Sequence, residues 1–212
     1  MNQGDAFRTG EGDAWFRRNR KYFETAAATD VPLRMLADGI PHLDSDSTVF
    51  EVGCASGWRL AEIQRRWDCD CYGIDVSAEA IEDGQRRWPG LNLAVASATG
   101  AGSRTPRADL VIVYFVMHWV DRREVLPSLA AIDRAVGEFL LIGDFCPDAP
   151  TEVPYRHKEG LVTYKSDYTI PFLMAGYRKV REIVFNHDTG ETSHYRIPED
   201  VRAHCALLQK ET

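Results

Sequence analysis

The segment 48–57 (TVFEVGCASG) constrains the fold more than any other, because a short apolar run leads directly into a turn of small residues. Glu51 lies near the end of the apolar run, and Gly53 and Gly57 frame the turn. Glycine adopts positive φ without steric cost and lets a ligand approach the backbone. The helix predicted over residues 58–66 begins with unpaired N–H groups that face whatever binds at the turn. The pattern predicts a strand, a ligand-binding turn and a helix in succession.

A second apolar run, residues 71–75 (CYGID), ends in Asp75 and is followed by the predicted helix 78–87. Strand, glycine turn, helix, strand and acid is the order found in nucleotide-type cofactor sites, where the second acid binds ribose hydroxyls. A dinucleotide fingerprint needs glycines at positions 53, 55 and 58, which hold Gly53, Ala55 and Trp58. An indole at the third position opposes the close helix–strand packing that NAD or FAD sites require. An NAD-dependent oxidoreductase is therefore the less favoured alternative.

The spacing of Glu51, Gly53, Ala55 and Gly57, followed by Gly73-Ile-Asp75, resembles the S-adenosylmethionine (SAM) site of class I methyltransferases. The chain departs from that family at Ala55, where the middle glycine is replaced. The resemblance runs in strand order from about residue 48 to the C-terminus, and its motifs lie in the first half. It implies SAM as cofactor and S-adenosylhomocysteine as product. The implied cofactor-binding residues are Glu51, Gly53, Cys54, Ala55, Gly57, Asp75, Val76, Ser97, Ala98, Tyr114 and Phe115.

Apolar runs and amphipathic stretches alternate along the middle of the chain. Strands are predicted at 49–52, 71–75, 91–96, 110–115 and 139–143, and helices at 58–66, 78–87 and 124–135. Such alternation predicts an α/β fold with a Rossmann-like, mostly parallel sheet and helices on both faces. Ligands should then lie outside the carboxyl ends of the strands. Two last strands, 178–187 and 201–209, predict a C-terminal antiparallel hairpin.

We expect one domain of 212 residues with four parts. These are an N-terminal helical cap (1–47), the cofactor-binding core (48–146), an acceptor-side insertion (147–177) and the terminal hairpin (178–212). In the cap, Trp15 and Tyr22 belong to an aromatic set at helical spacing. This set suits a layer packed on the sheet edge and a lid over the site equally well.

Charge and composition exclude several partners. With 25 basic and 32 acidic residues the net charge is −7, which repels phosphate backbones and argues against nucleic acid. No apolar stretch approaches the length of a membrane span, and no signal-peptide pattern is present at the start. Five cysteines without a zinc-like pair suit a reducing cytoplasm. We expect a cytoplasmic monomer or homodimer, and no metal site is predicted.

The exit of the fourth strand, Tyr114-Phe115-Val-Met-His118-Trp119, places aromatics and a histidine where an acceptor would bind. His118 is a candidate general base by its location, and an equally good account is a histidine held by the backbone. His157 is the competing candidate. It lies in a long segment whose Tyr155, Tyr164 and Tyr168 combine aromatic surface with hydrogen-bonding tips. Together with Trp15, Tyr22 and Trp119, these tyrosines are the predicted acceptor-binding residues.

The sequence thus predicts SAM-dependent methyl transfer to an oxygen or nitrogen of a small molecule, favouring a sugar-derived metabolite or a natural-product intermediate. A SAM-binding regulatory or scaffold subunit without catalysis is the alternative from another class.

Overall fold

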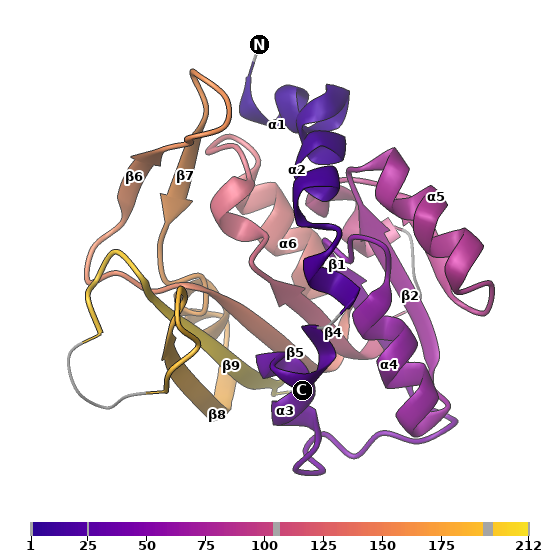
Figure 1. The fold of residues 1–212 in the computed structure, drawn as a ribbon. Helices are drawn as coiled ribbons and strands as arrows, with labels where there is room; N and C mark the ends of the chain where they lie inside the picture. Colours follow the sequence, from indigo (N-terminus) through magenta and orange to yellow (C-terminus); the bar gives the residue numbers. More distant parts are fainter. Residues whose placement is uncertain (1, 25, 104–106, 193–196, 212) are drawn as a thin grey trace.

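A seven-stranded sheet forms the centre of the computed structural model, which describes residues 2–24, 26–103, 107–192 and 197–211 (Figure 1). The spatial order is β3-β2-β1-β4-β5-β9-β8. The strands are β1 (Thr48–Val52), β2 (Asp70–Asp75), β3 (Asn92–Val95), β4 (Ala108–Tyr114), β5 (Val136–Phe145), β8 (Tyr177–Asn186) and β9 (Arg202–Lys210). The first five are parallel, and β9 runs antiparallel between β5 and β8. The predicted mostly parallel sheet with a C-terminal antiparallel hairpin is confirmed.

Helices cover both faces of the sheet, which explains why its strands are apolar without alternation. On one face, α3 (Val31–Leu36), α4 (Trp58–Trp67) and α5 (Ala78–Arg87) pack with Val49 and Leu110 into one core. On the other face, α6 (Val125–Ala135) and α7 (Ile170–Met174) pack with Phe50 and Val111. Successive residues of β1 and β4 therefore serve opposite cores.

Short helices precede β1. They are α1 (Gln3–Ala6), the π-helical turn η1 (Phe7–Glu11), α2 (Gly12–Asn19), two 3₁₀ turns, η2 (Tyr22–Glu24) and η3 (Ala26–Ala28), and α3. Asp13 of α2 attaches this part to the N-terminus of α5, because its Oδ1 accepts hydrogen bonds from Ser77 Oγ at 2.7 Å and Glu79 N at 3.1 Å. An acid at a helix N-terminus also complements the helix dipole. The attachment holds α2 next to the carboxyl end of β2.

The segment 147–177 contains a hairpin that the sequence did not predict, made of β6 (Thr151–Pro154) and β7 (Val162–Lys165). Each strand has four residues and few apolar side chains, too short a pattern to recognise. The hairpin lies beside the N-terminal helices (Figure 1). Val162 N donates to Gln3 Oε1 at 3.1 Å, so the two regions are joined at a backbone group.

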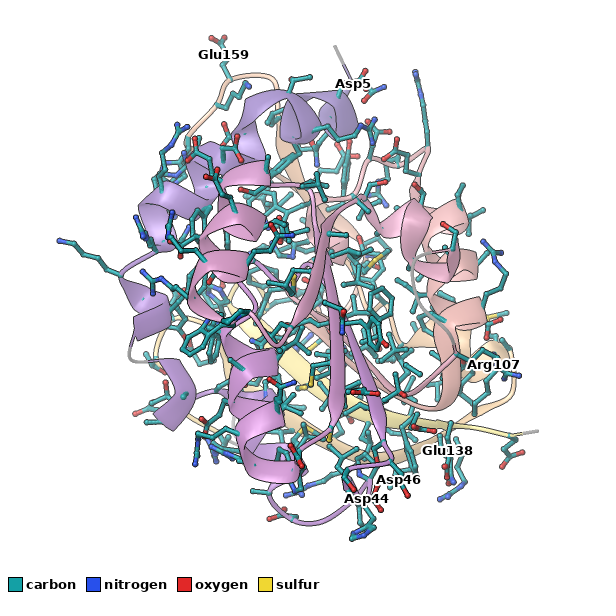
Figure 2. All side chains as sticks on the ribbon, turned by 90° about the vertical axis from the view of Figure 1, so that its right-hand side faces the viewer. Asp5, Asp44, Asp46, Arg107, Glu138 and Glu159 are labelled. Carbon is teal, nitrogen blue, oxygen red and sulfur yellow. The ribbon has the colours of Figure 1, made fainter. Side chains whose placement is uncertain are left out.

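The chain leaves β1 toward β2 and β3 and later returns to β4 on the other side of β1. The carboxyl ends of β1 and β4 therefore flank the topological switch point, where open α/β sheets bind ligands. Figure 2 marks the two ends of the molecule. The end where the parallel strands begin carries the labelled residues Asp44, Asp46, Arg107 and Glu138. The opposite end carries Asp5 and Glu159. Among the described residues, no helix has the length and apolar character needed to cross a membrane.

Gly84 allows α5 to pack closely on the glycine turn. A Cβ at this position would lie 2.4 Å from Ser56 O and 2.6 Å from Leu93 Cδ1. Gly84→Ala should lower the free energy of unfolding by about 1–3 kcal/mol through overpacking, although alanine is the better helix former. Gly100→Ala is the control, since its Cβ would meet only Ala96 Cβ at 3.6 Å. Urea denaturation measures both, and equal effects would contradict the close packing at Gly84.

Candidate functional site

The turn after β1 holds three residues in the left-handed region: Gly53 at φ 73°, Ala55 at φ 48° and Gly57 at φ 73°. Gly53 N donates to Ile74 O at 2.7 Å, which ties the turn to the end of β2. Ala55 adopts this conformation with a Cβ, which L-residues do rarely. Gly57 precedes α4 and offers no side-chain cap to the first N–H groups of the helix. The result is a bent backbone with helix amides at the carboxyl edge of the sheet.

Asp75 at the end of β2 supports the turn from the neighbouring strand. Its Oδ2 accepts from Ala55 N at 2.8 Å, and its Oδ1 accepts from Ser77 N at 2.8 Å. Burial raises the pKa of this carboxyl, against the effect of the backbone N–H donors. Each carboxylate oxygen can accept a second hydrogen bond, so Asp75 can hold a ligand's hydroxyls while keeping the turn in place.

Arg59 of α4 lies between two buried acids. Its Nη2 is 2.8 Å from Asp30 Oδ2, and its Nη1 contacts Glu51 Oε1. Asp30 also caps α3, because its Oδ1 accepts from Leu33 N at 3.0 Å. Burial alone would lower the pKa of Arg59, but Asp30 and Glu51 outweigh that effect and raise it. One guanidinium thereby connects α3, β1 and α4 directly beneath the turn.

A cavity of about 820 Å³ opens at this edge of the sheet. Nine predicted cofactor-binding residues line it: Gly53, Cys54, Ala55, Asp75, Val76, Ser97, Ala98, Tyr114 and Phe115. Glu51 and Gly57 are not among the lining residues. Glu51 is fully buried and reaches the cavity only through Arg59, which lines it. The volume lies within the range of small-molecule sites.

The end of β4 forms an aromatic wall of this cavity. The rings of Tyr114 and Phe115 lie 4.7 Å apart, edge to face. Phe115 has φ 55°, a conformation that costs energy in a non-glycine residue and that turns its ring away from the strand direction. Its ring also contacts Phe145 at 5.4 Å and His187 at 5.0 Å.

Trp15, Tyr22 and Trp119 line the cavity as predicted acceptor residues should, but Tyr155, Tyr164 and Tyr168 are absent from its lining. Tyr155 packs against Trp119 at 4.8 Å, and its hydroxyl donates to Glu11 Oε1 at 2.9 Å. The Tyr168 hydroxyl donates to the carbonyl of Tyr164 at 2.6 Å. These three tyrosines therefore lie outside the cavity lining, and Tyr155 lies behind Trp119. The order of residues in the sequence could not reveal this.

Neither predicted base candidate lines the cavity. His118 is 3% exposed, with Nδ1 2.8 Å from Asp144 Oδ1 and its ring 4.5 Å from that of Trp119. This is the environment of a histidine fixed in a core. His157 lies on the far side of Tyr155, at 5.3 Å between rings.

The structure adds lining residues that the sequence did not single out. Asp30, Arg34, Arg59, Ser128, His187 and Asp188 all line the cavity. They come from α3, α4, α6 and the β8–β9 connection, and no local motif marks them. Only the fold brings these distant segments together.

A second hollow, of about 920 Å³, lies at the other end of the sheet. It is bordered by the ends of α4 and α5, among them Trp67 and Trp88, and by residues just before β1. It lies at the amino ends of the strands. Parallel sheets bind ligands at the opposite edge, so the cavity at Asp75 is the candidate site.

Comparison with known proteins places the sequence among methyltransferase-like chains. Residues 49–138, which include the turn and β1 to the start of β5, match the family model described as a methyltransferase domain. The sequence of this segment is therefore similar to methyltransferase domains. A relative from Azoarcus sp. (strain BH72), trans-aconitate 2-methyltransferase, is 28% identical over 113 residues, which are 52% of this chain. The match spans 44% of that relative, less than half of its length.

Solved structures extend the likeness of the methyltransferase domain to nearly the whole chain. Magnesium protoporphyrin IX methyltransferase from Synechocystis PCC 6803, solved with bound SAM, superposes with a TM-score of 0.66 at 13% identity, covering 98% of this chain and 94% of that one. A TehB-like SAM-dependent methyltransferase from Corynebacterium glutamicum gives a TM-score of 0.60 at 17% identity, covering 98% of this chain and 100% of that one. At these identities the likeness shows the fold.

Arg59→Met tests the buried charge cluster. The substitution leaves Asp30 and Glu51 without their cation, so the free energy of unfolding should fall by about 3–5 kcal/mol. Arg65→Met on the same helix is the matched control. Arg65 is 69% exposed and pairs with Glu62, so its loss should cost about 0–1 kcal/mol. Chemical denaturation measures both, and similar losses would contradict the central role of Arg59.

The titration of Glu51 gives a second test. Burial raises its pKa from an ordinary value near 4.5 to about 7. The stability gained from this protonation is fully present below pH 4.5 and is lost as the pH rises through about 7. Relative to Glu51→Gln, the wild type should therefore lose up to about 3 kcal/mol between pH 4.5 and 7.5. A difference in unfolding free energy that is flat over this range would show that Glu51 stays ionised.

Proposed function

We propose that this protein transfers a methyl group from SAM to an oxygen or nitrogen of a small molecule. The observation that carries the proposal is the placement of Asp75 and the glycine turn on one cavity at the switch point of the sheet. The matched family model and the SAM-bound fold relative support the same cofactor.

The polar groups around the cavity fit that cofactor. Asp75 keeps acceptor capacity for two ribose hydroxyls, and Ser97 and Ala98 lie where the family contacts adenine. Ser128 Oγ is buried beside this end and has no hydrogen-bond partner among the described residues. Buried polar atoms without partners are rare in folded proteins, so Ser128 suits a site that a ligand completes. At the methionine end, the turn and the Arg59–Asp30 pair would hold the charged groups of the amino acid.

The residues of the site suit methyl transfer in two ways. The aromatic rings of Tyr114 and Phe115 tolerate a cationic ligand, since ring faces attract cations. The N-terminal helices supply Phe7, Trp15 and Tyr22 to the cavity lining, and we propose that they act as a lid which excludes water. When bound, SAM supplies an activated methyl group on a sulfonium. The protein's main contribution is then to position the acceptor at attacking distance, which can be worth about 7–11 kcal/mol.

The acceptor we favour is a sugar-derived metabolite or natural-product intermediate of modest size. Asn19, Trp15 and Tyr22 offer hydrogen bonds and ring surfaces for a hydroxylated molecule. The curated relative is named for trans-aconitate, a carboxylic acid, and this makes carboxylates the second acceptor class to test. A SAM-binding subunit without catalysis remains the alternative, and turnover distinguishes it.

Asp75→Ala tests the cofactor assignment. Loss of the carboxylate leaves the ribose hydroxyls without their acceptor and should weaken S-adenosylhomocysteine binding by about 1–3 kcal/mol, or about 5- to 150-fold. Asp70→Ala at the exposed start of the same strand is the control and should bind as the wild type does. Isothermal titration calorimetry measures both. Binding of NAD in place of S-adenosylhomocysteine by the wild type would refute the proposed function.

A further inference from the structure

His187 lines the cavity, on the connection that follows β8. Its ring packs against Phe115 at 5.0 Å and Phe145 at 4.8 Å between centroids. The side chain is 42% exposed, so the ring has one face on the aromatic wall and remains open to solvent and ligand. His118 also contacts these two rings, at 5.9 and 5.3 Å between centroids, and is enclosed. Phe115 and Phe145 thus contact both a buried histidine and an accessible one.

Asp188 sets the orientation of the His187 ring. Its Oδ1 lies 2.9 Å from His187 Nδ1, and since a carboxylate only accepts, Nδ1 must be the donor. In the neutral imidazole this leaves the lone pair on Nε2. A histidine held in one tautomer by a carboxylate, with its other nitrogen free, is the arrangement of a general base. Both residues line the cavity.

We propose that His187, oriented by Asp188, is the base that deprotonates the methyl acceptor. The inference rests on the proposed function and deepens it, because it commits the acceptor to a nucleophile that carries a proton, a hydroxyl or an amine. A carboxylate acceptor is already deprotonated at neutral pH and has no use for this base. A base at His187 therefore favours hydroxyl and amine acceptors over carboxylates.

The proton and electron balance is complete without another reactant. The acceptor's lone pair forms the new bond to the methyl carbon, the carbon–sulfur pair stays on sulfur as the positive charge there is neutralised, and the acceptor's proton passes to His187 Nε2. The resulting imidazolium is stabilised by Asp188 at 2.9 Å. Because the side chain is partly exposed, the proton can then leave to solvent.

Other charged groups lie around His187. Lys165 of β7 places its Nζ 3.9 Å from the centre of the Phe145 ring, which His187 also contacts. Burial lowers the pKa of Lys165, and the charges of Asp200, Asp188 and Asp144 oppose this effect. Arg202 of β9 pairs across the strands with Asn186 and forms an ion pair with Asp148. Arg34 of α3 lines the same cavity, and His118 contacts the Phe115 ring. Asp188 is the acid in direct contact with the ring.

The first experiment reads the tautomer and needs no acceptor. Long-range ¹H–¹⁵N correlation spectra of the protein saturated with S-adenosylhomocysteine distinguish the two ring nitrogens of each histidine. Neutral His187 should carry its proton on Nδ1, and Asp188→Ala should shift the population toward Nε2–H. His42, which is 85% exposed, provides the reference for an unconstrained ring. A neutral His187 with its proton on Nε2 would overturn the proposal.

The second experiment measures turnover with labelled SAM and two sets of probes. One set contains amino sugars and polyhydroxylated sugars, and the other contains trans-aconitate and citrate. Methylation should occur in the first set, and His187→Gln should lower kcat by about 10²- to 10⁴-fold and remove the acidic limb of its pH profile. S-adenosylhomocysteine affinity should stay within threefold, and His42→Gln should leave turnover unchanged.

The possible outcomes distinguish failure of the base from failure of the proposed function. Turnover confined to the carboxylates, or a His187→Gln variant within a few-fold of the wild type, overturns the base while the proposed function stands. A protein that binds S-adenosylhomocysteine and methylates no probe in either set overturns the base together with catalysis. Absence of S-adenosylhomocysteine binding refutes the proposed function itself, and the tautomer of His187 in the free protein still tests the dyad.

Discussion

The buried contact of Arg59 with Asp30 and Glu51 is the interaction on which the site depends. It joins the helix before the sheet, the first strand and the helix after the glycine turn through one side chain. Charges removed from water are costly, and they are tolerated where each has a partner in good geometry. Because Asp30 and Arg59 line the cavity while Glu51 lies beneath it, the same cluster that fixes the turn also places charge at the methionine end of the proposed cofactor site. We propose that the same atoms support the turn and recognise the ligand.

Two residues that line the cavity, one after β1 and one after β4, have strained backbone conformations. Ala55 and Phe115 adopt positive φ although neither is glycine. Such conformations cost about 1–3 kcal/mol each and persist only where surrounding contacts impose them. Asp75 holds Ala55 through its amide, and Gly143 O accepts from Phe115 N at 2.8 Å. Gly143 also leaves room for the Tyr114 ring, which would lie 2.7 Å from a Cβ there. The strain sits where a rigid, preformed surface benefits ligand binding, and neighbouring strands supply the restraints.

The N-terminal helices connect two regions that are far apart in the sequence. Asp13 fastens α2 to the start of α5, and Gln3 and Glu11 reach the β6–β7 hairpin through Val162 N and the Tyr155 hydroxyl. Phe7, Tyr155 and Leu161 form a small core of their own at this contact. The hairpin thus packs against the helices that contribute residues to the cavity. Its predicted acceptor-binding tyrosines do not line the cavity themselves.

The sequence alone determined the order of the strands in the seven-stranded sheet and of the helices between its parallel strands, the sheet type and the residues at the ends of β1 and β2, because apolar runs, turn glycines and helix starts are local signals. Asp75 and the turn could be placed for this reason. The short β6–β7 hairpin carries no such signal and was not predicted. Tertiary structure decided everything that depends on distant segments meeting: the pairing of Arg59 with Asp30, the enclosure of His118, the exposure of His187 and the position of Tyr155 behind Trp119. His118 and His187 show the difference most clearly. Both follow the end of a strand in sequence, and both contact the edge-to-face pair of Phe115 and Phe145. One is buried and the other lies at the cavity, and such packing has no signature along the chain.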